Sequence, residues 1–252
     1  IALSYSIIAI TVVALVVTAV LGRDSSSAPS QPSGVPGRTV AAVELPGMLL
    51  TLDEVKAIMA QQPGASPAPN LTAQQPNTEP VSSPGPRGTV TPDSCISSMI
   101  AGSDAAYNNN NNGYRAIYTV TMSQPGVGTE ITQSVAVFDD GASAQRALDV
   151  SLGQQDECRD RGDLATIYFT EPGAAQPHKW TSGKPVKFGD YYMTRISFGA
   201  FDDPGPANRR DRYAENRTIA ARGNVLVDVV VRGAGVYSQQ QDVINGILGR
   251  LK

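Results

Sequence analysis

Histidine and cysteine are scarce in this sequence, and their scarcity limits the chemistry that the protein can perform. His178 is the only histidine, and Cys95 and Cys158 are the only cysteines. No HExxH, P-loop, EF-hand or GxSxG segment is present. A Ser/His/Asp arrangement would depend on His178, which lies in the Pro-rich segment AAQPHKW, where we expect an exposed loop. We therefore expect no catalytic residue, no metal site, no cofactor and no enzymatic activity.

Charged residues are also few, and the two signs are balanced. The chain has 20 Lys and Arg against 23 Asp and Glu, which gives a net charge of -3. No basic stripe runs along any predicted element, although proteins that bind nucleic acid need one to neutralise phosphates. We therefore exclude nucleic acid as a partner. The sequence is rich in Ser, Thr, Gln, Asn, Gly and Pro, a composition that occurs in cell-envelope proteins.

Residues 1–22 (IALSYSIIAITVVALVVTAVLG) contain no charge at all. A helix of this length rises about 33 Å, which matches a hydrocarbon core of about 30 Å. The alternative is a cleaved signal peptide, whose apolar region would span about 7–15 residues and end in a small-x-small site. The segment Thr18–Leu21 fits such a site poorly. We therefore expect a transmembrane helix over 1–22, with the lipid bilayer as a partner and further cytoplasmic residues before Ile1.

The two cysteines are compatible with a disulfide or with two separate buried thiols. Cys95 and Cys158 are far apart in sequence and belong to no CxxC motif. Behind a membrane anchor, an oxidising compartment favours the disulfide, which would stabilise the fold by about 4 kcal/mol on the chain-entropy model. This interpretation places the domain on the extracytoplasmic side of the membrane.

After a flexible linker at 23–38, the hydrophobic pattern predicts one domain over 39–252. A capping box at Thr51 and Glu54 begins a short helix. The low-complexity stretch 62–91 is either disordered or wrapped on a surface. Further helices are expected from Thr91 to near Tyr107, over Gly141–Cys158 and over 237–251. Strands are expected over Tyr114–Met122, Ile131–Phe138, 164–170, 185–189, 191–198, 214–221 and 224–232. This order does not alternate as βαβ units do, so we predict an α+β fold with an antiparallel sheet flanked by helices.

Asp228 interrupts the apolar strand VLVDVVV and therefore needs a partner, because an unpaired buried charge is costly. A salt bridge or a solvated sheet face would explain it. The functional alternative is a carboxylate that faces a ligand in a cleft, opposite Arg195 or Tyr192. These three residues are the candidate ligand-binding residues.

Several segments resemble one known family, the PknH-like extracytoplasmic sensor domains of mycobacterial and other actinobacterial membrane-anchored proteins and lipoproteins. They are LLTLDEVKAIMA, the helix that carries Cys95, TQSVAVFDDGASAQRAL, the region of Cys158, and NVLVDVVVRG before the last helix. The resemblance covers residues 40–252. It implies a central antiparallel sheet flanked by helices, with a cleft for an unidentified ligand.

This chain departs from the family pattern in two ways. It contains no kinase domain ahead of the apolar segment, so signalling through phosphorylation is not carried over. It also lacks the second disulfide that family members tend to have in the later half, which we therefore expect to be looser or to rely on packing alone.

Two functions follow as hypotheses. The first is a membrane-anchored, non-enzymatic extracytoplasmic sensor domain that binds an envelope lipid or glycan. The second is an accessory subunit that docks on a larger membrane or cell-envelope protein complex.

Overall fold

The computed structural model describes residues 37–61, 70–81, 89–103, 107, 113–124, 129–159, 164–170, 178–198, 214–233 and 238–252. The predicted membrane helix at 1–22 and nearly all of the predicted linker at 23–38 lie outside these ranges. Within them, no helix has the length and apolarity needed to cross a bilayer.

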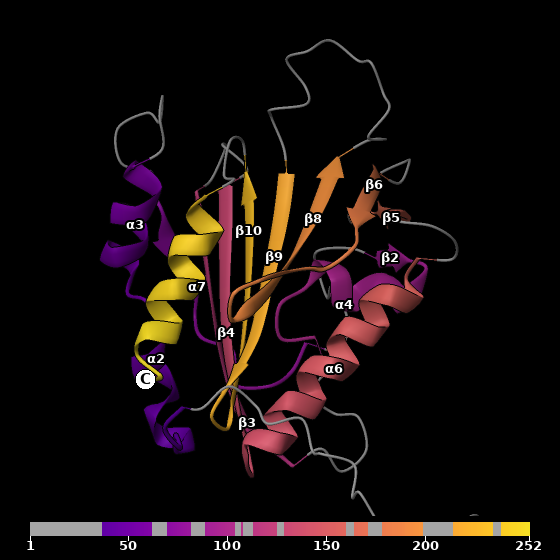
Figure 1. Ribbon diagram of the computed structural model, residues 1–252. Coiled ribbons are helices and arrows are strands. Elements are labelled where there is room, and N and C mark those ends of the chain that lie inside the picture. Colours follow the sequence, from indigo (N-terminus) through magenta and orange to yellow (C-terminus); the bar gives the residue numbers. More distant parts are fainter. Residues whose placement is uncertain are drawn as a thin grey trace, which may run out of the picture. The chain divides into compact units, whose positions relative to one another are not determined.

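The centre of the fold is a ten-stranded antiparallel sheet (Figure 1). Its order is β1-β3-β4-β10-β9-β8-β6-β5-β2, and β7 pairs with β8 beside β6. The strands are β1 (Thr72–Ala73), β2 (Thr89–Thr91), β3 (Tyr114–Gln124), β4 (Thr129–Phe138), β5 (Leu164–Thr170), β6 (His178–Gly183), β7 (Val186–Phe188), β8 (Tyr191–Phe198), β9 (Ala214–Arg222) and β10 (Val225–Gly233). The predicted antiparallel α+β fold is therefore confirmed.

Helices cover both faces of this sheet. The described helical segments are η1 (Ala42–Glu44), α2 (Leu45–Met48), α3 (Leu52–Ala60), η3 (Asp93–Cys95), α4 (Ile96–Met99), α6 (Gly141–Glu157) and α7 (Gln239–Gly249). Helix α7 packs with α2 and α3 on one face, and α6 packs on the other (Figure 1). We call these the α7 face and the α6 face.

Two helix starts follow directly from the sequence. The Thr51 hydroxyl accepts a hydrogen bond from the backbone N–H of Glu54 at 3.3 Å, and the Glu54 carboxylate accepts one from the Thr51 N–H at 2.7 Å. This is the predicted capping box, which satisfies two otherwise unpaired N–H groups at the start of α3. Asp140 caps α6 in a similar way, through Ser143.

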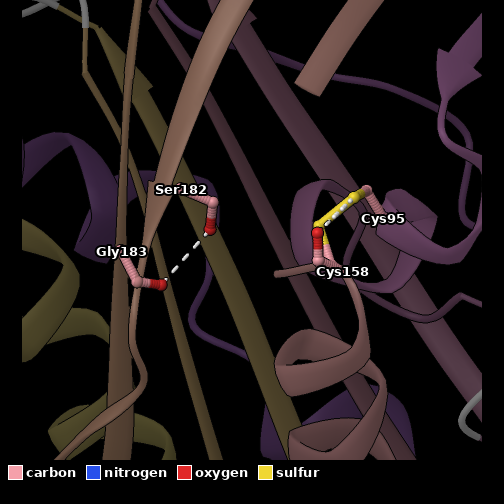
Figure 2. Close-up of a disulfide and its surroundings, with 4 residues drawn as sticks. All are labelled: Cys95, Cys158, Ser182 and Gly183. Carbon is pink, nitrogen blue, oxygen red and sulfur yellow. Dashed lines mark hydrogen bonds between the residues drawn. A yellow bond between two sulfur atoms is a disulfide. The ribbon is translucent and has the colours of Figure 1, made fainter. Parts of the chain in front are cut away.

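A disulfide joins Cys95 and Cys158, the pair that the sequence predicts (Figure 2). It connects the end of η3 to the residue that follows α6, with Cα atoms 4.7 Å apart. Both cysteines are buried in a small cluster with Val90, Met99 and Trp180. The disulfide therefore fixes the position of α4 against the C-terminal end of α6.

Two predicted elements were wrong. The helix that carries Cys95 ends at Met99, not near Tyr107, because Ile100 is extended and Gly102 adopts a positive φ of 73°. The segment around His178, expected to be a loop, begins strand β6, which pairs with β5 and β8. Pro177 and Gly183 at its ends obscured this strand.

The described part of the low-complexity stretch 62–91 lies along the sheet. Strand β1 pairs with β3, and Asn77 forms a bridge with Thr119 farther along the same strand. Leu71 is buried in the core of the α7 face. For these residues, wrapping on a surface is the correct alternative; 62–69 and 82–88 lie outside the described residues.

Candidate functional site

The α6 face of the sheet contains a buried polar cluster, built by the register of β9 and β10. Asp228 pairs across the strands with Ile219, so Arg217, two residues along β9, lies diagonally beside Asp228 on the same face. The Asp228 and Arg217 side chains are both fully buried. Two oppositely charged residues on neighbouring strands thus form the centre of the cluster.

Asp228 accepts four hydrogen bonds. Two come from the Arg217 guanidinium, from Nε at 2.8 Å to Oδ1 and from Nη2 at 2.7 Å to Oδ2. The other two come from the Gly102 backbone N–H at 3.0 Å and the Tyr107 hydroxyl at 3.3 Å. This fork geometry satisfies the carboxylate, which is what a buried charge requires. The salt-bridge explanation of Asp228 is therefore correct.

A second group of charges continues the cluster toward the end of β10. Arg232 forms an ion pair with Glu215 on β9 and another with Glu130 on β4, at 3.5 Å. Arg232 also donates to the backbone carbonyl of Met99 at the end of α4. The polar cluster therefore includes the sheet, α4 and α6, whose Ser151 accepts a hydrogen bond from Arg217.

Burial changes the titration of this cluster. Burial raises the pKa of Glu215 above its usual value of 4.5, against the opposing effect of Arg232. Burial and the negative charge of Asp228 together raise the pKa of Tyr107 well above its ordinary value. Tyr107 is therefore a neutral hydrogen-bond donor at physiological pH.

Several buried polar atoms of this cluster have no hydrogen-bond partner among the described residues. They are Arg217 Nη1, Glu215 Oε1, Gln155 Nε2 and the hydroxyls of Ser97, Ser98 and Ser103. Each such atom costs about 1–3 kcal/mol if nothing occupies its hydrogen-bonding position. These atoms come from β9, α4, α6 and the segment that follows α4, and a buried water or a ligand that can both donate and accept would satisfy them.

The three candidate residues of the sequence stand in different places. Asp228 belongs to the polar cluster, and Tyr192 lies on the same face of the sheet, two strands away, in register with Ile219. Arg195 pairs with Asn216 and so lies on the α7 face, where its side chain is exposed. The structure therefore brings Asp228 and Tyr192 to one face and separates Arg195 from them.

Arg217 is the residue that the sequence reasoning missed. A usable signal was present, because the Gly223-Asn224 pair between two apolar strands predicts a two-residue hairpin turn. That turn fixes the register, and the register places residues 217 and 228 on one face.

Among the described residues of the polar cluster, charged and polar side chains pair with one another, and no nucleophile is hydrogen-bonded to a histidine base. Across the described residues, no group of three His, Cys, Asp or Glu side chains is placed to hold a metal ion.

Comparison with known proteins gives the chain a context. Residues 40–250 match a family described as PknH-like extracellular domain. The serine/threonine-protein kinases PknJ of Mycobacterium bovis and Mycobacterium tuberculosis are each 29% identical over 218 residues, which cover 84% of this chain and 33% of the kinase. The chain thus spans about a third of the length of these relatives. A solved structure also matches, the crystal structure of the extracellular domain of PknH from Mycobacterium tuberculosis. It aligns over 85% of this chain and 97% of that chain, with a TM-score of 0.66 and 22% sequence identity. The two chains therefore share a fold.

Proposed function

The chain belongs to the family of PknH-like extracellular domains, as its sequence motifs predicted, and we propose that it is a membrane-anchored, non-enzymatic sensor domain on the extracytoplasmic side. In this proposal residues 1–22 anchor the chain in the bilayer, and the domain over 39–252 binds a ligand. The extracellular character of the family and the disulfide both support the location. The matched relatives are kinases, but this chain covers only a third of them, so no kinase output is assigned to it.

The set of buried, unpartnered polar atoms in the polar cluster is the observation that carries this proposal. Folding brought these groups out of water without giving them partners among the described residues, and a bound ligand would supply those partners. Because the unpartnered atoms include both donors and an acceptor, the ligand that fits best is rich in hydroxyl groups. An envelope glycan, or the glycan portion of an envelope lipid, has this chemistry.

A thermal-shift titration tests the proposal. The full chain, extracted in mild detergent, is titrated with envelope glycans and glycolipids while its melting temperature is followed. A ligand that binds only the folded state raises the melting temperature in a concentration-dependent way. If no fraction of the source cell envelope shifts the melting temperature, ligand binding is contradicted.

A pair of variants locates the binding site. In Ser98→Ala a hydroxyl that lacks a partner is removed, so the unliganded protein loses no stability and gains some, while ligand affinity falls about three- to tenfold, as expected for one lost hydrogen bond. Thr218→Val is the matched control, because Thr218 is equally buried and its hydroxyl also lacks a partner, but it lies on the α7 face. Equal losses in both variants would mean that the ligand does not bind at the polar cluster.

The accessory role is tested in the same preparation. We expect the detergent-extracted chain to elute alone. Stoichiometric membrane proteins that remain bound through purification would favour the accessory subunit.

A further inference from the structure

A second feature, away from the polar cluster, is a cleft of about 590 Å³ between the last turn of α7 and the turn that joins β7 to β8. Phe188 and Tyr191 form one side with stacked rings 6.4 Å apart, and Asn245, Gly249 and Lys252 form the other. A Cβ atom added at Gly249 would meet nothing within 4 Å. Packing among the described residues therefore does not explain a glycine here, and the space beside it is open.

This cleft lies at the end of the domain where the chain arrives from the N-terminal segment. Arg222, which lines the cleft, pairs with Asp190 in the β7–β8 turn and precedes Gly223 in the β9–β10 turn. The backbone of Gly37 packs against Gly223, and the Arg38 N–H donates to the Leu251 carbonyl at 3.3 Å. The first described residues of the domain thus contact the elements that form the cleft.

The distance from this end of the domain to the uncharged segment is limited by the chain between them. Residues 23–36 separate the segment 1–22 from Gly37, and fourteen residues span at most about 50 Å when fully extended. An anchor at 1–22 therefore keeps Gly37 within about 50 Å of the bilayer surface, so this end of the domain can reach it.

The surface at this end combines apolar and basic side chains. Exposed large hydrophobic residues are few among the described residues, and two of the four are on β7: Val186 at 51% exposure and Phe188 at 40%. Lys184 precedes β7, and Lys252 borders the cleft, whereas Lys187 lies over the Tyr192 ring on the opposite face of β7. Exposed apolar side chains beside lysines are typical of surfaces that contact an anionic membrane.

We propose that this end of the domain, formed by β7, the β7–β8 turn and the last turn of α7, docks on the outer surface of the membrane that anchors the chain. Phe188 and Val186 enter the interfacial region, and Lys184 and Lys252 contact anionic lipid headgroups. The cleft receives part of one headgroup beside Gly249. This inference rests on the anchoring part of the proposed function and is independent of the ligand at the polar cluster.

Fluorescence quenching in nanodiscs tests the docking. The full chain is incorporated into discs of phosphatidylglycerol and brominated phosphatidylcholine, and tryptophan probes are compared with the wild-type chain, whose only tryptophan is Trp180. Phe188→Trp places the probe in the docking surface. Tyr168→Trp is the matched control, because Tyr168 is exposed to 42%, almost the same as Phe188, but lies on β5, level with the end of β8, whereas Phe188 pairs with the start of β8.

We expect the emission added by Phe188→Trp to fall at least about twofold in brominated discs, because interfacial side chains insert about 5–10 Å. The emission added by Tyr168→Trp should stay unchanged. Lys184→Glu and Lys252→Glu should each lower the ratio of docked to undocked domain about fivefold or more, and discs without phosphatidylglycerol should have the same effect.

Two results would overturn the inference, and they are distinguishable. Equal quenching of both probes in a chain that enters the discs would contradict the docking but not the membrane anchor. Failure of the full chain to enter the discs would contradict the proposed membrane anchor, and with it the docking.

Discussion

The two faces of strand β10 differ sharply, although both are buried. Toward the α7 face the strand presents Val225, Val227, Val229 and Val231, each fully buried in an aliphatic core. Toward the α6 face it presents Leu226, Asp228, Val230 and Arg232, and the two charged residues form ion pairs with β9. One strand thus serves a hydrophobic core on one side and a polar cluster on the other.

The covering helices follow the same division. Helix α7 buries Val243, Ile244, Ile247 and Leu248, whereas α6 contributes Ser151 and Gln155 together with alanines and a leucine. Burying apolar surface stabilises a fold without further requirements, whereas burying charge is neutral at best and needs complete pairing. The α7 face therefore supplies stability, and the α6 face, which contains the buried ion pairs, is the side on which we place ligand binding.

The largest effect should come from breaking the buried pair on the α6 face. Asp228→Ala leaves Arg217 buried without a counter-charge, and we expect a loss of about 3–5 kcal/mol in the free energy of unfolding. Urea denaturation of the full chain in detergent, followed by the emission of Trp180, measures this loss. The double variant Arg217→Met/Asp228→Leu should recover part of it, because no unpaired charge remains. A double variant as unstable as the single one would mean that the charge itself is not responsible.

A smaller loss is expected from the α7 face. Ile244→Ala removes a fully buried side chain from the aliphatic core and should cost about 3 kcal/mol, through lost transfer energy and the cavity left behind. Unlike Asp228→Ala, it should leave ligand affinity at the polar cluster unchanged. The same urea and titration experiments measure both quantities. A fall in affinity here would show that the two faces are coupled.

The smallest effect concerns an ion pair on the surface beside α7. Glu54 is paired with Arg250, and a hydrogen bond from the Thr51 backbone, with the help of Arg250, lowers the pKa of Glu54 from 4.5 to about 2. The ionised carboxylate therefore stabilises the fold above pH 4.5, and this contribution disappears as the pH falls from 4.5 toward 2. Because Glu54 is half exposed, solvent screening limits the contribution to less than about 1 kcal/mol.

Glu54→Gln tests this contribution. We expect its melting temperature to be slightly below that of the wild-type chain at pH 7, and the difference to vanish near pH 2. A difference that persists at pH 2 would indicate lost packing in place of lost charge.

The sequence predicted most of the fold because strong local signals mark most elements. Each of these signals can be read from one short stretch of sequence: the capping box at Thr51, the alternation of apolar and polar residues in β3, and the apolar stripe of α7. Strand β6 was missed because its edges are Pro177 and Gly183 and its pattern is short. The early end of α4 was missed because it depends on Gly102, whose N–H is bound by Asp228 far along the chain.

The polar cluster was only partly predictable for a related reason. Asp228 is recognisable in a single strand, since it interrupts a run of valines. Its partners Arg217, Tyr107 and Gly102 come from three segments, and only the sheet register and the path of the chain after α4 bring them together. Periodicity within one segment carries no information on such contacts.

The attachment of the first residues of the domain has a mechanical consequence. Asn224 accepts a hydrogen bond from the Val40 N–H at 2.8 Å, donates to the Val40 carbonyl at 3.0 Å and donates to the Phe138 carbonyl at 3.0 Å. With the bond from Arg38 to Leu251, this side chain forms a clasp between the N-terminal segment and the β9–β10 turn. A pull on the chain before Gly37 would load this clasp first, so a few hydrogen bonds would open before any strand of the sheet bore tension.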